Sequence, residues 1–121
     1  MKSYNKDIGN YGEKLAISYL IDNNYDILCH SFKCKQGEVD IIAKTQDIIC
    51  FIEVKSRYSR LYGAPIESVT YSKRNRIINT AKYYLYINKT KNCNVRFDVI
   101  ELILNNTNNI YNINHIKDAF R

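Results

Sequence analysis

Three residues in two adjacent strand-like segments of this sequence could form a metal centre. Asp40 lies in the segment 38–44, and Glu53 and Lys55 lie in the segment 48–57, which has the strongest strand pattern in the chain. Because successive side chains of a strand point to opposite faces, Glu53 and Lys55 share one face. Carboxylate oxygens suit Mg²⁺ or Mn²⁺, and such an ion lowers the pKa of bound water and neutralises charge on a phosphoryl group.

The geometry of this centre depends on the turn between the two segments. A hairpin turn of two or four residues gives one register, in which Asp40 lies opposite Glu53 and Glu38 lies opposite Lys55. The Cβ atoms of directly opposite residues are roughly 4.5–5.5 Å apart. A three-residue turn would shift the pairing by one residue and place Asp40 and Glu53 on opposite faces.

Two carboxylates held this close repel each other unless a cation or a proton lies between them. The backbone carbonyl of Val54 could add a further metal ligand. Lys55 could orient or deprotonate a water molecule, or stabilise developing negative charge. We therefore predict Asp40, Glu53 and Val54 as metal ligands, and Asp40, Glu53 and Lys55 as catalytic residues.

A solvated hairpin is the alternative to a metal centre. Taken singly, each of these charged residues is more often part of a surface ion pair. Their neighbours favour the metal centre because they are apolar: Val39, Ile41, Ile42, Phe51, Ile52 and Val54. Charged side chains in so apolar a hairpin cost free energy unless they are paired or coordinated.

The order of the predicted elements is that of an α/β layered protein. Helical apolar spacing, strand-like runs and turn residues predict a helix at 8–23, strands at 25–34, 38–44 and 48–57, a loop at 58–67, a helix from Thr70 or Ser72 to about Asn88, a strand at 95–104, a turn at 105–109 and a last strand at 110–116. The α-β-β-β-α-β order predicts a mixed sheet flanked by helices, in one domain that spans residues 1–121.

The charge of the chain indicates an anionic partner. The formal net charge is +6, and nucleic acid is the common partner of such a basic protein. Near the predicted centre, we expect phosphate contacts from Arg57, Arg60, Lys73 and Arg74. A basic surface that only maintains solubility is the alternative, and it is a serious one for Arg74 and for Arg76, which lies in the first turns of the same predicted helix.

Other features limit the class of protein. No apolar run approaches the roughly 18 residues of a membrane span, and the N-terminus has no apolar signal core, so we expect a cytoplasmic protein with no membrane partner. We expect Asp98 to pair with Arg96 or another neighbour, and His30 and His115 to be structural. Without C-x-x-C spacing, reduced and mostly buried thiols are expected at Cys29, Cys34, Cys50 and Cys93.

These residues, in this order, resemble the PD-(D/E)XK nuclease superfamily. The chain is more closely similar to the YraN-like family of small bacterial proteins, which resemble Holliday-junction resolvases. The resemblance covers almost the whole chain, and its motifs are Gly9-Asn10-Tyr11-Gly12-Glu13, Gly37-Glu38-Val39-Asp40-Ile41-Ile42-Ala43, Phe51-Ile52-Glu53-Val54-Lys55-Ser56-Arg57, Tyr62-Gly63-Ala64-Pro65, Lys73, Arg96-Phe97-Asp98-Val99 and Ala119-Phe120.

The resemblance implies a restriction-endonuclease-like α-β-β-β-α-β core with catalytic positions at Asp40, Glu53 and Lys55. It also implies a catalytic role for Glu13, although helical spacing alone favours a solvated position at the border of an apolar face. Val39 stands where the superfamily pattern has proline, a residue that does no chemistry. Relatives of the resolvase type suggest branched DNA as the substrate and a homodimer as the assembly.

Three hypotheses follow. The first is an endonuclease that depends on Mg²⁺ or Mn²⁺ and cleaves DNA. The second is a catalytically silent module that keeps the nuclease fold and binds nucleic acid or a protein. The third is a small interaction protein with no role on nucleic acid.

Overall fold

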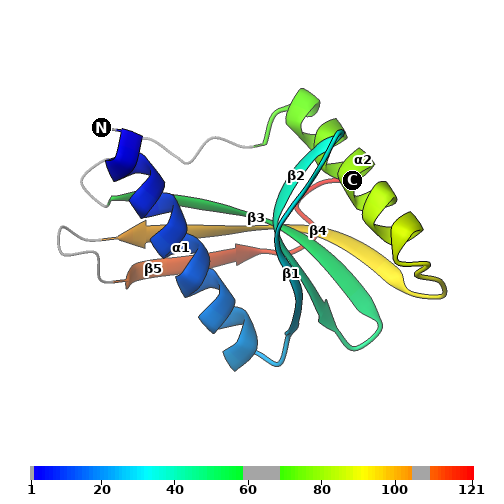
Figure 1. The fold of residues 1–121 in the computed structure, drawn as a ribbon. Coiled ribbons are helices and arrows are strands. Elements are labelled where there is room, and N and C mark those ends of the chain that lie inside the picture. Colours follow the sequence, from blue (N-terminus) through cyan, green and yellow to red (C-terminus); the bar gives the residue numbers. More distant parts are fainter. Residues whose placement is uncertain (1, 59–68, 105–109) are drawn as a thin grey trace.

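A five-stranded mixed sheet and two helices make up the part of the chain that the computed structural model describes, residues 2–58, 69–104 and 110–121 (Figure 1). The elements are α1 (Lys2–Asp22), β1 (Asp26–Cys34), β2 (Gly37–Thr45), β3 (Ile48–Tyr58), α2 (Tyr71–Ile87), β4 (Asn94–Leu104) and β5 (Ile110–Ile116). This order confirms the predicted restriction-endonuclease-like core and its additional last strand. The predicted turn at 105–109 and nearly all of the predicted loop at 58–67 lie outside the described residues.

The strands lie in the order β1-β2-β3-β4-β5. Neighbouring strands are antiparallel except for β3 and β4, which are parallel. A parallel pair needs a crossover connection, and α2 lies between β3 and β4 in the sequence. β3 is therefore the central strand, and it carries both Glu53 and Lys55.

The two helices begin for different reasons. Thr70, one of the two predicted cap residues, caps α2 because its Oγ1 accepts a hydrogen bond from the Lys73 amide at 3.2 Å. α1 begins at Lys2, so the predicted start at Ile8 was wrong. Residues 2–7 are mostly polar and lack an apolar period, but they contain no proline or glycine, and extending an existing helix costs little.

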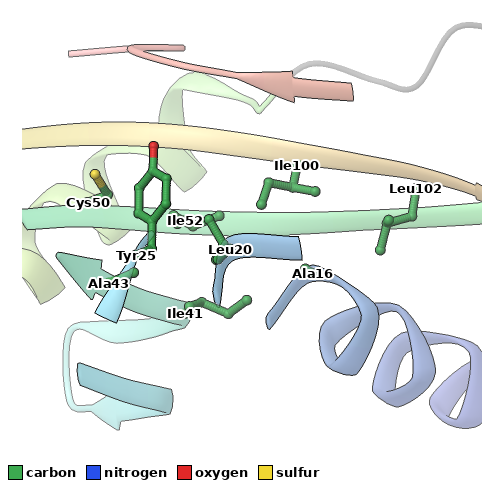
Figure 2. Close-up of a cluster of buried hydrophobic side chains, with 9 residues drawn as sticks. All are labelled: Ala16, Leu20, Tyr25, Ile41, Ala43, Cys50, Ile52, Ile100 and Leu102. Carbon is green, nitrogen blue, oxygen red and sulfur yellow. The ribbon is translucent and has the colours of Figure 1, made fainter. Parts of the chain in front are cut away.

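Each face of β3 packs against a different helix. Cys50 and Ile52 lie in one buried cluster with Ala16 and Leu20 of α1 (Figure 2). Phe51 lies in a second buried cluster, on the side of α2, together with Ile77 and Ala81 of that helix. The alternation continues along β3, so Glu53 and Lys55 follow Phe51 on the face that α2 covers only in part.

A buried polar network ties the first helix to the last strands. Asp98 is fully buried, and Arg96 donates to its two oxygens at 2.9 Å from Nε and 2.9 Å from Nη2. His115 Nε2 lies 2.8 Å from the same carboxylate, and the Asp118 amide donates to it at 3.0 Å. Tyr19 of α1 contacts His115 Nδ1 through its hydroxyl at 3.1 Å. The predicted Asp98–Arg96 pair and the structural role of His115 are both confirmed.

The cysteines and the helix lengths also bear on the predictions made from the sequence. The four cysteines are free, as predicted, but only Cys50 is buried, and the other three are partly exposed because they lie on β1 and near the start of β4. Within the described residues, neither helix is long and apolar enough to cross a membrane.

Gly12 allows α1 to lie close to β3. A Cβ atom at this position would collide with Ser56 Oγ. Ser56 Oγ is itself buried and has no hydrogen-bond partner among the described residues. The absence of a side chain at Gly12 therefore sets how closely the helix that carries Glu13 approaches the sheet.

Gly12→Ala should lower the free energy of unfolding by about 1–3 kcal/mol, because the added methyl group overpacks the helix–sheet contact. In an open helical position the same change would instead stabilise the protein by up to about 1 kcal/mol. Urea unfolding of Gly12→Ala, Ser56→Ala and the double variant would measure the coupling. Removing Oγ should recover part of the loss, whereas strictly additive effects would contradict this contact. Asn10→Ala, at an exposed position of the same helix, is the control.

Candidate functional site

The β2–β3 hairpin has the predicted register. The pairing runs from Thr45–Ile48 to Ile41–Ile52, so the connection is a two-residue turn. Gln46 in this turn has a φ of 54°, a left-handed conformation that two-residue hairpin turns favour. The pairing ends at Ile41–Ile52. The next predicted pairs, Asp40 with Glu53 and Glu38 with Lys55, therefore lie beyond the end of the ladder.

β2 separates from β3 at Asp40, and this separation sets the direction of the Asp40 side chain. Val39 and Ile42 both lie in the cluster beside α2, so the usual alternation of faces is broken between them. Asp40 turns into the gap between the strands, where its Oδ2 accepts a hydrogen bond from the Val54 amide at 2.8 Å. A side-chain carboxylate thus takes the place of the backbone acceptor that a continued ladder would supply.

Asp40 and Glu53 line a pocket with a volume of about 540 Å³. One wall belongs to α2, another to the end of the β1–β2 hairpin, and α1 contributes one residue. The lining residues are Glu13, Lys33, Cys34, Gly37, Glu38, Asp40, Glu53, Val54, Lys73, Arg76 and Ile77. The pocket therefore combines four carboxylates with three cationic side chains.

The two inner carboxyl groups are hard to ionise together. Burial and the charge of Glu53 raise the pKa of Asp40 to about 7, although the Val54 amide opposes this shift. Glu53 is only 5% exposed, and burial raises its pKa even though Lys73 and Lys55 act in the opposite direction. Such a pair becomes fully charged at little cost only when a cation joins it.

Two lysines accompany Glu53. Lys73, in the first turn of α2, places Nζ 3.5 Å from Glu53 Oε2. Lys55 follows Glu53 on the same face of β3, and burial together with the charge of Lys73 lowers its pKa. A lowered pKa increases the neutral fraction of the Lys55 amine, and only the neutral amine can accept a proton.

Glu13 reaches the pocket from α1. Its side chain is 20% exposed, and its Oε1 lies 2.8 Å from His30 Nε2 of β1. Glu13 is therefore partly buried and lines the pocket rather than being fully solvated, while the catalytic role that the family resemblance implies stays a prediction. The sequence offered no partner for His30, because its contact with Glu13 joins residues 17 positions apart.

The predicted phosphate-binding residues lie in different environments. Lys73 lines the pocket. Arg74 Nε donates to the Val69 carbonyl at 3.0 Å, so part of its guanidinium supports the start of α2. Arg57 lies partly buried on β3. Arg60 lies outside the described residues.

Sequence reasoning did not place Lys33 at the site, and for Arg76, as for Arg74, it left phosphate contact and solvated surface as alternatives. Arg76 lies one turn after Lys73, at the i,i+3 spacing that places side chains on one helix face. Lys33 pairs with Glu38 across the β1–β2 ladder, and both residues line the pocket. The spacing of Arg76 from Lys73 is consistent with its position in the pocket lining, whereas Lys33 could be found only from the register of β1 with β2.

The donors fit a magnesium-like ion better than zinc. Within residues 2–58, 69–104 and 110–121, no three histidine, cysteine, aspartate or glutamate side chains form a group that could hold a metal ion. Two carboxylates, Asp40 and Glu53, are available. The N–H and C=O of a strand residue face the same neighbour, so the Val54 carbonyl faces the side of Asp40. Mg²⁺ typically binds one or two carboxylates and keeps several waters.

Asp40→Asn should stabilise the metal-free protein at high pH. The folded protein keeps the Asp40 proton up to about pH 7, whereas an unfolded chain loses it near pH 4, so stability falls as the pH rises between these values. Asparagine cannot ionise, yet its oxygen can still accept from the Val54 amide. We expect a gain of about 1–3 kcal/mol at pH 8 and little change at pH 4.

Urea unfolding in the presence of a chelator would measure this difference. Asp26→Asn, at an exposed position of β1, is the matched control and should change stability little at either pH. A loss of stability in Asp40→Asn at pH 8 would contradict the electrostatic cost assigned to Asp40.

Comparison with known proteins places most of the chain in one family. The family model described as "Uncharacterised protein family UPF0102" matches residues 12–102. A UPF0102 protein of Clostridium perfringens (strain 13 / Type A) is 55% identical over 121 residues, which cover 100% of this chain and 99% of that protein. A UPF0102 protein of Clostridium tetani (strain Massachusetts / E88) is 54% identical with the same coverage. One of Clostridium novyi (strain NT) is 48% identical over 120 residues, 99% of this chain and 100% of that protein.

Proposed function

The chain belongs to the UPF0102 family, and from the chemistry of its acidic pocket we propose that it is a metal-dependent endonuclease that acts on DNA. One observation carries the proposal. Asp40 is hydrogen-bonded to the Val54 amide beside the buried carboxyl of Glu53, and Lys55 follows on the same strand face. This is the residue set that the resemblance to the PD-(D/E)XK nuclease superfamily implies.

Each residue has a defined role in the proposal. Asp40, Glu53 and the Val54 carbonyl would hold Mg²⁺ or Mn²⁺, which supplies an acidified water and neutralises phosphate charge. Lys55 orients the attacking water and accepts its proton. The water oxygen bonds to phosphorus, one P–O ester bond breaks, and the leaving oxygen takes a proton from solvent. Glu13, held by His30, assists from the α1 side of the pocket.

The cationic residues favour a polyanionic substrate. Lys33, Lys73 and Arg76 line the same pocket as the carboxylates, and the whole chain carries a formal charge of +6. Cations next to a hydrolytic centre neutralise phosphates on either side of the bond that breaks. Branched DNA is the finer proposal, and it rests on the resemblance to resolvases. A two-fold dimer would suit a junction with two strands to cut.

Asp40→Asn and Lys55→Ala should each lower the rate of DNA cleavage by at least roughly 100-fold, because each removes a group that acts in the transition state. The assay compares linear and branched DNA with Mg²⁺, Mn²⁺ or a chelator. Asp26→Asn and Lys44→Ala, at exposed positions outside the pocket, should retain wild-type activity.

Equal cleavage by the wild type and by the Asp40→Asn and Lys55→Ala variants would refute the assignment. DNA binding that weakens with salt, without cleavage and without heat of Mn²⁺ binding in calorimetry, would instead support the catalytically silent binding module. Absence of DNA binding at low salt would indicate an interaction protein with no role on nucleic acid.

A further inference from the structure

We propose that Lys73 is an internal counter-ion that occupies Glu53 in the metal-free protein and must leave it when a divalent cation binds. Once released, the ammonium group is available for a substrate phosphate in the same pocket. This inference rests on the proposed function, because it assumes that Asp40 and Glu53 form a divalent-cation site.

The two side chains of this ion pair differ in their exposure to solvent. The Lys73 Nζ and Glu53 Oε2 atoms are 3.5 Å apart, but the Glu53 side chain is only 7% exposed, whereas the Lys73 side chain is 48% exposed. Glu53 is fixed in the wall of the sheet, and Lys73 reaches it from the first turn of α2. Lys73 can therefore swing into solvent or toward a ligand with little loss of packing.

Charge compensation explains why Lys73 lies there. Glu53 is a buried carboxyl beside a second carboxyl, that of Asp40, and an uncompensated pair would be costly. In the described structure the compensating charges come from Lys73 and Lys55. A divalent cation on Asp40 and Glu53 would supply that charge itself and would repel the ammonium of Lys73 from its present position.

The surroundings of Lys73 indicate where it would go. Arg76, one turn further along α2, and Lys33 on the opposite wall line the same pocket, and neither makes an ion pair among the described contacts. Lys73 would join them as a third cation facing the substrate. Binding of the cation and binding of phosphate would then favour each other. The cation displaces Lys73 from Glu53 and frees it for phosphate, and phosphate draws Lys73 away from Glu53 and leaves that carboxylate to the cation.

The test is Mn²⁺ binding by the full chain at pH 8, measured by calorimetry and by thermal unfolding with and without Mn²⁺. We expect Lys73→Gln to bind Mn²⁺ roughly tenfold more tightly than the wild type, because a competing charge is removed. We also expect its melting temperature to fall in chelator and to rise more than that of the wild type when Mn²⁺ is added. Its DNA cleavage should decrease despite the tighter metal binding.

Two variants separate charge from other effects. Lys73→Arg keeps the charge and should bind Mn²⁺ like the wild type. Lys82→Gln removes a lysine from an exposed position of α2 outside the pocket and should change neither affinity nor melting temperature. If the wild type binds Mn²⁺ and Lys73→Gln binds it no more tightly, this inference is wrong and the proposed function stands. If the wild type binds no Mn²⁺, the proposed function is wrong and the inference fails with it.

Discussion

The hydrogen bond from the Val54 amide to Asp40 fixes the geometry of the acidic pocket. It forms where β2 separates from β3, so it replaces a missing backbone contact and also holds a carboxylate beside Glu53. If the ladder continued by two pairs, to Val39 and Val54, the Val54 amide would bond to the Val39 carbonyl and Asp40 would lose its anchor. The divergence also opens the space that the end of the β1–β2 hairpin and α2 enclose as a pocket.

The central strand supports this geometry from both sides. Cys50 and Ile52 are fully buried beneath α1, and Phe51 is fully buried on the side of α2, so β3 cannot rotate without exposing one cluster. Burial of side chains of this size contributes about 1.5–3 kcal/mol each. The close approach at Gly12 then brings Glu13 to the pocket. Rigid packing thus positions charged groups whose own arrangement costs free energy.

The sequence predicted much of this arrangement because its main determinants are local. Apolar runs indicated the strands, Thr70 was one of two candidate caps for α2, and the hairpin register followed once the connection was a two-residue turn. Contacts across long separations could not be derived in this way. The pairing of Glu13 with His30, and the position of Lys73 on Glu53, depend on how helices settle on the sheet. Helical and strand periodicity gives the face on which a side chain lies, but not the distance between residues on different elements.

The surroundings of two buried carboxyl groups, Asp98 and Asp40, shift their pKa values in opposite directions. Burial alone would raise the pKa of Asp98, but hydrogen bonds from His115, Arg96 and the Asp118 amide lower it below its ordinary value. Each lone pair of that carboxylate is used, so the site stabilises the fold and has no capacity left for a ligand. Asp40 receives one amide hydrogen bond, and its pKa rises to about 7. The neighbours of Asp98 therefore satisfy it fully, whereas Asp40 accepts one hydrogen bond and lies beside a second buried carboxyl, that of Glu53. A divalent cation bound there would therefore balance charges that the fold itself balances only in part.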